Sequence, residues 1–148
     1  MRIAPLTSTH AEDICTWRYP APYDCYDMTG AQPAELLGAG FNAVLIDDEL
    51  IGFRSFGTDG QVPGWVYDDT ALDTGGGLRP SLIGKGWGRT AIQTGLAYGA
   101  EHFHPQAFRV TIARFNTRAL RTVSSLGFRP IGQFASTNDQ QQYVVLTR

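Results

Sequence analysis

Spaced hydrophobic residues predict three helices along the chain. Across residues 88–103, apolar and small residues recur at intervals of three or four, which is the period of a helix with one buried face. The segment 116–126 shows the same spacing, begins with a residue type that caps helices well and is followed by a glycine. An earlier helix is expected to begin at Ser8 or Thr9, because Glu12 stands three residues after Thr9, as in a capping box.

Short apolar or alternating runs between these helices predict strands. We expect a strand within each of seven segments: 2–6, 41–46, 50–56, 66–78, 108–112, 131–134 and 143–146. The acidic triplet 47–49 joins two of them as a hairpin, whereas three consecutive glycines, 75–77, are expected to break the strand that contains them. Helices and strands follow one another without a linker or a repeat, which predicts a single α/β domain over residues 1–148.

The length and composition of the chain fit one globular domain. It has 148 residues, of which 43% are hydrophobic, so it can bury a core without disulfides or a structural metal. The N-terminal segment lacks the apolar stretch of a signal peptide, and no hydrophobic run approaches the length that crosses a bilayer. We therefore expect a cytoplasmic protein without a membrane partner. Neither the two cysteines nor the three histidines show metal-ligand spacing, so no metal is expected.

Charge is distributed unevenly between the two halves of the sequence. Residues 1–78 hold twelve acidic and three basic side chains, whereas residues 79–148 hold nine basic and two acidic ones. A basic half suits a polyanionic ligand and an acidic half suits a cationic one, unless both halves fold together and their fields cancel. The overall net charge is −2 and the basic residues form no run, which argues against a nucleic-acid partner.

The segment before the longest predicted helix has the composition of an anion site. Three alternating glycines, Gly84, Gly86 and Gly88, allow the backbone to turn tightly and to direct several N–H groups at one ligand. The helix N-terminus behind them adds a partial positive charge, and Lys85 and Arg89 add mobile positive side chains. The alternative is a glycine-rich turn that only connects a strand to a helix.

Two other phosphate-binding motifs match this segment less well. A Walker loop needs serine or threonine after its glycine–lysine pair, but Gly86 follows Lys85. The pattern Gly86-x-Gly88-x-x-Ala91 matches a dinucleotide fingerprint, yet no acidic residue stands about 20 positions further on. A nucleotide-dependent oxidoreductase of Rossmann type therefore remains only as an alternative.

The glycine segment resembles motif A of the GNAT superfamily of N-acetyltransferases. From Pro80 onward it carries the run Pro-x-x-x-Gly-x-Gly-x-Gly, which family members often show. Residues 116–128 resemble motif B of the same family, with Asn-x-x-Ala at the start and Leu-Gly-Phe at the end. The two motifs stand in the order of the family, one helix and one strand apart. The resemblance implies an α/β (α+β) fold with a single mixed, mostly antiparallel sheet flanked by helices.

The same resemblance implies that acetyl-CoA is the co-substrate. It places the backbone near Leu78 and Arg79 against the pantetheine arm and the N–H groups of residues 84–89 on the pyrophosphate. Asn116 would bond the pantetheine region, cap its helix, or do both. The residues that the resemblance assigns to the cofactor are Leu78, Arg79, Ile83, Gly84, Lys85, Gly86, Trp87, Gly88, Arg89 and Asn116.

The sequence departs from the family pattern at two positions. Ile83 stands where motif A has arginine or glutamine, which removes one side-chain contact but leaves the backbone cradle. Val123 stands where many members have the tyrosine that serves as general acid. Protonation of a leaving thiolate would then come from water or from another residue, or would not be needed.

Fewer residues can be assigned to the part of the predicted site that binds the acceptor. Asp73 is the candidate proton acceptor, because it lies on the strand that leads into motif A; Asp68 and Asp69 are weaker candidates. The resemblance places the segment after the first helix at the acceptor cleft, where aromatic faces and carboxylates suit a cationic amine. The aromatic candidates in that segment are Trp17, Tyr19, Tyr23 and Tyr26.

These observations predict an N-acyltransferase that moves an acetyl group from acetyl-CoA to an amine by direct attack. The acceptor is a small molecule or a peptide, and the resemblance also allows a homodimer. A non-catalytic domain of the same fold that only binds acyl-CoA is the first alternative, supported by Ile83 and Val123. The Rossmann-type oxidoreductase is the second.

Overall fold

The computed structural model describes residues 1–148 except Ala39. Its seven strands are β1 (Arg2–Pro5), β2 (Phe41–Ile46), β3 (Glu49–Phe56), β4 (Leu72–Leu78), β5 (Phe108–Ala113), β6 (Arg129–Ala135) and β7 (Gln142–Thr147). Its four α-helices are α1 (Ser8–Thr16), α2 (Pro33–Leu37), α3 (Trp87–Phe103) and α4 (Thr117–Ser125). None of the described helices is long and apolar enough to span a membrane.

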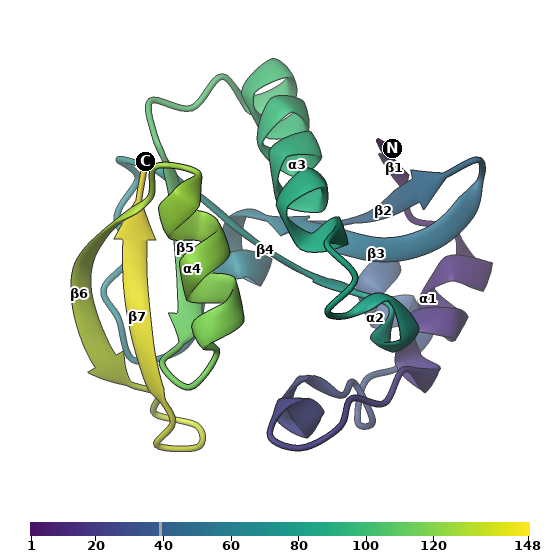
Figure 1. The fold of residues 1–148 in the computed structure, drawn as a ribbon, viewed down its shortest axis with the longest axis horizontal. Coiled ribbons are helices and arrows are strands. Elements are labelled where there is room, and N and C mark those ends of the chain that lie inside the picture. The colour runs from purple at the N-terminus through teal and green to yellow at the C-terminus, as the bar shows by residue number, and fades with distance from the viewer. Residues whose placement is uncertain (39) are drawn as a thin grey trace.

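The strands form one sheet in the order β1-β2-β3-β4-β5-β7-β6, and all neighbours are antiparallel except β4 and β5. The parallel pair is very short, since only Leu72 and Asp73 of β4 pair with Phe108 and Arg109 of β5. Beyond these positions the two strands diverge in the middle of the sheet (Figure 1). A mostly antiparallel sheet confirms the fold class that the sequence predicts and contradicts the Rossmann alternative, which requires a parallel sheet.

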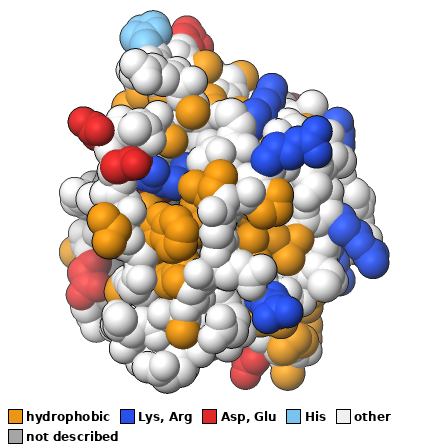
Figure 2. Space-filling view, turned by 90° about the vertical axis from the view of Figure 1, so that its left-hand side faces the viewer, with side chains coloured by type: hydrophobic (Ala, Val, Ile, Leu, Met, Phe, Trp, Pro, Cys, Tyr) orange, Lys and Arg blue, Asp and Glu red, His pale blue; other side chains and the backbone are white. Residues whose placement is uncertain are grey.

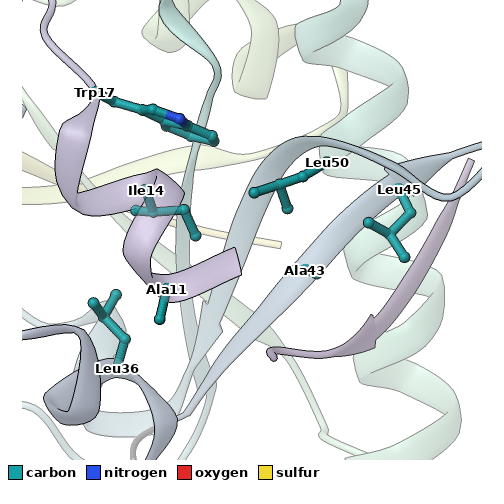
Figure 3. Packing of buried hydrophobic residues seen from close by; sticks show 7 residues of the cluster. All are labelled: Ala11, Ile14, Trp17, Leu36, Ala43, Leu45 and Leu50. Atoms are coloured by element: carbon teal, nitrogen blue, oxygen red, sulfur yellow. The ribbon is translucent and has the colours of Figure 1, made fainter. Parts of the chain in front are cut away.

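Helices α1 and α2 cover one face of the first half of the sheet. Figure 3 shows the cluster that Ile14 of α1, Trp17 just after α1 and Leu36 of α2 form with Ala43, Leu45 and Leu50 of the strands. Ile14 and Ala43 are almost completely buried, so this cluster is a packed core.

Helix α3 packs on the opposite face through its small residues. A Cβ on Gly99 would lie 2.8 Å from the ring of Phe108, and a Cβ on Gly95 would lie 2.9 Å from Nε of Arg54. Glycine at these positions therefore lets the helix approach the sheet closely. Leu96 of α3 joins Val123 of α4 in a second apolar cluster over β5 and β7.

Local structure differs from the sequence prediction in three places. The cap of α1 is Thr7, whose hydroxyl accepts from the backbone N–H of His10, while the His10 ring accepts from the Thr7 N–H. Helix α2 has only five residues, too few for a period to be recognised. Strand β4 continues through all three glycines. Their role is close contact with β3, since a Cβ on Gly76 would lie 2.4 Å from the Phe53 carbonyl oxygen.

Candidate active site

A cavity of about 690 Å³ opens where β4 and β5 diverge. Its walls come from the end of β4, the middle of β5, the start of α3 and one side of α4. Aromatic side chains from the segment between α1 and α2 line it as well, so the cavity brings together parts of the chain that are distant in sequence. The residues from the strands are Arg54, Phe53, residues 74–78 and residues 110–112.

The glycine segment forms the cavity wall at the N-terminus of α3. Gly84 and Gly86 have φ angles of 77° and 86°, a left-handed conformation that glycine adopts without strain. Gly86 is the N-cap of α3, and a Cβ on Gly86 or Gly88 would meet no atom within 4 Å. The first N–H groups of a helix have no partner within the helix, so the start of α3 can offer free donors to the cavity that Gly86 and Gly88 line.

Two arginines add positive charge near this loop. Arg89 lines the cavity and donates to the hydroxyl of Ser125, at the far end of α4. Arg118, in the first turn of α4, lies within 4.0 Å of the position that a Cβ on Gly84 would take. Its guanidinium also stacks over the ring of Tyr23, 5.5 Å from the ring centroid. Arg118 was not predicted from the sequence, although its place two residues after the motif B asparagine could have indicated it.

The residues predicted to bind the cofactor divide into two groups. Those that line the cavity are Leu78, Ile83, Gly84, Gly86, Gly88, Arg89 and Asn116. Lys85 on the loop, Trp87 at the start of α3 and Arg79 lie outside the lining.

Arg79 is a correction to the predicted cofactor set. Its backbone N–H donates to the carbonyl oxygen of Ile51, so it is already used within the sheet. Its guanidinium pairs with Asp13 and donates to the carbonyl oxygen of Leu50. This contact holds α1 against β3, so neither the backbone nor the side chain of Arg79 faces the cavity.

Asn116 connects the two sides of the cavity. Its side-chain oxygen accepts from the N–H of Ala119, as expected of a helix cap. Its side-chain nitrogen donates to the hydroxyl of Tyr26 over 3.2 Å, which attaches the aromatic segment to α4. A contact between Asn116 and a pantetheine arm stays a prediction.

Three of the four predicted aromatic residues, Tyr19, Tyr23 and Tyr26, line the cavity. The Tyr19 hydroxyl donates to the carbonyl oxygen of Leu78, and burial raises its pKa to about 12. Burial also raises the pKa of Tyr26 to about 12, so both phenols are neutral at physiological pH. Tyr23 lies next to Tyr26, with 6.5 Å between ring centroids.

Trp17 is a correction to the predicted acceptor residues. Only 5% of its surface is exposed, and its ring packs against Phe53 with the Arg79 guanidinium stacked over it. Its indole N–H donates to Asp13 over 3.0 Å. Trp17 therefore belongs to the core beneath α1.

Asp73 is the main correction to the predicted chemistry. Its carboxylate is buried and receives two hydrogen bonds from Arg109, of 2.6 and 2.8 Å, and a third from Gln61. It lies on the face of β4 away from α3 and does not line the cavity. A carboxylate held in this way cannot reach an amine in the cavity, so we do not assign it as the proton acceptor.

The weaker candidates are no better placed. Asp68 also pairs with Arg109, and hydrogen bonds from Thr70 and Arg109 lower its pKa to about 2. These two aspartates together raise the pKa of Arg109. Asp69 is exposed and lies outside the cavity lining.

Charge is distributed over the surface as well as inside the cavity. On the face shown in Figure 2, most lysine and arginine side chains lie on one side, and most acidic ones lie elsewhere. Inside the cavity all the charged side chains are basic, because the described lining contains Arg54, Arg89 and Arg118 but no aspartate or glutamate. Arg54 was not predicted from the sequence, because its only signal is that it is a charged residue in an apolar strand.

Proteins of known structure share this architecture. No family model and no curated protein sequence matches the chain. Among solved structures, a GNAT-family acetyltransferase from Bacillus anthracis is 17% identical with a TM-score of 0.70, over 99% of this chain and 92% of that one. A chimera of the spermidine N-acetyltransferase SpeG from Vibrio cholerae and hSSAT is 16% identical with a TM-score of 0.74, over 99% and 94%.

An aminoglycoside acetyltransferase, AAC(6')-Ib, in complex with coenzyme A also has a similar structure. It is 16% identical with a TM-score of 0.74, over 99% of this chain and 93% of that one. Identities this low show the arrangement of the chain and not its activity. The protein therefore has the fold of the GNAT-family acetyltransferases.

Proposed function

We propose that the protein is an N-acyltransferase that transfers an acetyl group from acetyl-CoA directly to an amine. One observation carries the proposal: a glycine cradle at the N-terminus of a 17-residue helix opens into a cavity at the divergence of β4 and β5. Structures of the same fold include acetyltransferases of spermidine and of aminoglycosides, one of them with coenzyme A. Their names support the reaction class and leave the acceptor open.

The residues of the cavity fit coenzyme A. Gly86 and Gly88 line the cavity at the N-terminus of α3, whose first N–H groups suit a pyrophosphate, with Arg89 and Arg118 available to its charges. Between the loop and the strands, Ile92, Val110 and other apolar side chains suit the uncharged pantetheine arm. When bound, acetyl-CoA supplies an activated thioester.

The acceptor side binds and orients the amine. Tyr19, Tyr23 and Tyr26 offer aromatic faces, and a site of this kind works by holding the amine nitrogen close to the thioester carbon. The new C–N bond forms, the C–S bond breaks, and CoA leaves as its thiol. No described lining residue is a carboxylate, so the amine must lose its proton to water. Val123 lines the cavity where a general acid is common in the family and has no proton to donate, so the proton for the thiolate comes from water or from another residue.

The second candidate is a domain that binds acyl-CoA without catalysis. It is favoured by one observation, the absence of an acidic or imidazole side chain from the described lining. The two candidates differ in turnover and not in binding. Release of free thiol from acetyl-CoA in the presence of an amine would exclude the second candidate.

Acetyl-CoA is expected to raise the melting temperature of the protein. At a hundredfold excess over its dissociation constant, a ligand that binds only the folded state stabilises it by about 2.7 kcal/mol. For a chain of this size that corresponds to an increase of about 5–10 °C, which thermal unfolding with and without ligand measures. NAD serves as the control and should give no increase; an increase with NAD alone would contradict the proposed cofactor.

Thiol release from acetyl-CoA is expected with at least one class in a panel of amines. The panel contains polyamines, aminoglycosides, aromatic amines, amino acids and peptides with a free N-terminus. The rate should depend on amine concentration and should saturate, because the amine binds before it reacts. If the melting temperature rises with acetyl-CoA while no amine accelerates thiol release, the binding-domain alternative is the correct one.

A further inference from the structure

Arg54 is a buried cation in the wall of the cavity. It extends from β3 towards α3 and is only 6% exposed. One terminal nitrogen donates to the hydroxyl of Thr74 over 2.8 Å, and Nε has no hydrogen-bond partner among the described residues. The side chain runs between two glycines, Gly76 on β4 and Gly95 on α3, which leave room for it.

Arg54 has no negative partner in the described part of the protein. It takes part in none of the ion pairs found there, and no acidic side chain is among the described residues that line the cavity. Asp73 and Asp68 bind Arg109, Asp13 binds Arg79, and Asp27 accepts from the N–H of Tyr19. Burial lowers the pKa of Arg54 to about 10, so it is still charged at neutral pH. An unpaired buried charge is costly, which suggests that a ligand pairs with it.

The phosphate groups of a cofactor are too far away to be that ligand. Arg54 packs at Gly95, nine residues into the helix from the cap at Gly86. At 1.5 Å per residue these positions are about 13 Å apart along the axis of α3. The phosphate end of the cavity already has Arg89 and Arg118, so Arg54 serves the opposite end, where the two strands meet.

We propose that Arg54 binds a carboxylate carried by one of the two substrates. The proposal rests on the proposed function and narrows its substrate class. The carboxylate is either the terminal group of a dicarboxylic acyl chain on CoA or the carboxylate of an amino-acid-type acceptor. Both sources offer the planar oxygen pair that a guanidinium binds well. The described lining holds no carboxylate that could bind the several cationic groups of a polyamine or an aminoglycoside.

Two ligand pairs test this proposal by calorimetry. The first compares S-carboxyethyl-CoA with S-propyl-CoA, two unreactive thioethers that differ in a terminal carboxylate. The second compares phenylalanine with phenethylamine, each titrated into protein saturated with S-propyl-CoA. The variants are Arg54→Gln, which removes the charge, and Arg54→Lys, which keeps it. Melting temperatures of both variants establish that they are folded.

In wild-type protein, one of the two pairs is expected to show at least tenfold tighter binding of the carboxylate member. Arg54→Gln should abolish that preference and Arg54→Lys should retain part of it. A preference in the first pair identifies the acyl chain as the source, and a preference in the second identifies the acceptor. Equal binding within both pairs, or a preference that survives in folded Arg54→Gln, would overturn the proposal. If Arg54→Gln does not fold, the proposal is tested by comparing binding within each ligand pair in the wild-type protein and in Arg54→Lys.

The same titrations separate this inference from the proposed function. Binding of S-propyl-CoA to wild-type protein supports a CoA site whatever the carboxylate pairs show. If S-propyl-CoA fails to bind, the proposed function is wrong.

Discussion

Gly86→Asp is expected to abolish CoA binding, with the dissociation constant increasing at least a hundredfold. The aspartate Cβ would project into the open space in front of α3, where the phosphates are expected. Its charge would repel a phosphate at a helix terminus that otherwise attracts anions. A φ of 86° adds backbone strain for any residue other than glycine. Calorimetric titration of CoA into the variant measures the loss.

Gly57→Asp is the matched control for this experiment. Gly57 has a similar left-handed φ of 76°, and a Cβ there also meets no atom within 4 Å. It lies outside the cavity, so the substitution introduces the same strain and charge away from the loop. CoA should bind Gly57→Asp as it binds the wild type. If folded Gly86→Asp also binds CoA with unchanged affinity, the glycine segment is not the phosphate site.

Asp73→Ala is expected to destabilise the fold by about 3–5 kcal/mol. The substitution leaves the buried guanidinium of Arg109 without its main partner, and breaking one side of a buried ion pair typically costs this much. The melting temperature should fall by about 6–20 °C. Urea unfolding at equilibrium gives the free energy directly.

Asp69→Ala is the control for Asp73→Ala. Asp69 is exposed four residues before Asp73 and takes part in none of the ion pairs found in the described residues, so its loss should change stability by no more than about 0.5 kcal/mol. The result that would restore a catalytic role for Asp73 is a variant with wild-type stability and a large loss of kcat.

Helices of the fold could be predicted where the periodic segment is long or where a capping residue marks its end. The spacing over residues 88–103 and the cap at Asn116 led to α3 and α4 within a residue or two. The glycine loop could be located because its chemistry depends on the backbone, and the order of residues alone describes it. Strand β4 could not be predicted through its glycines, since their role is close contact with Phe53 across the sheet.

Side-chain roles could not be predicted where they depend on which face of a strand a residue occupies. Asp73 and Arg54 are both charged residues in strands beside the cavity, and only the three-dimensional pairing separates them. Asp73 faces Arg109, which lies 36 positions further along the chain. Arg54 faces α3 and the cavity, where no acidic residue was available to pair with it in the described lining. Trp17 was misassigned for a related reason. An aromatic residue at the end of a helix can pack in a core or line a cleft, and the sequence does not distinguish the two.

The short pairing of β4 with β5 gives the sheet two strand edges in its interior, in addition to those of β1 and β6. An unpaired edge ordinarily invites pairing with another chain and leads to aggregation. Here the two inner edges border the cavity, whose walls include α3 and α4. The helices and the aromatic segment that form the cavity walls therefore cover these inner edges in part, which lowers the risk of aggregation that an edge brings at an open surface.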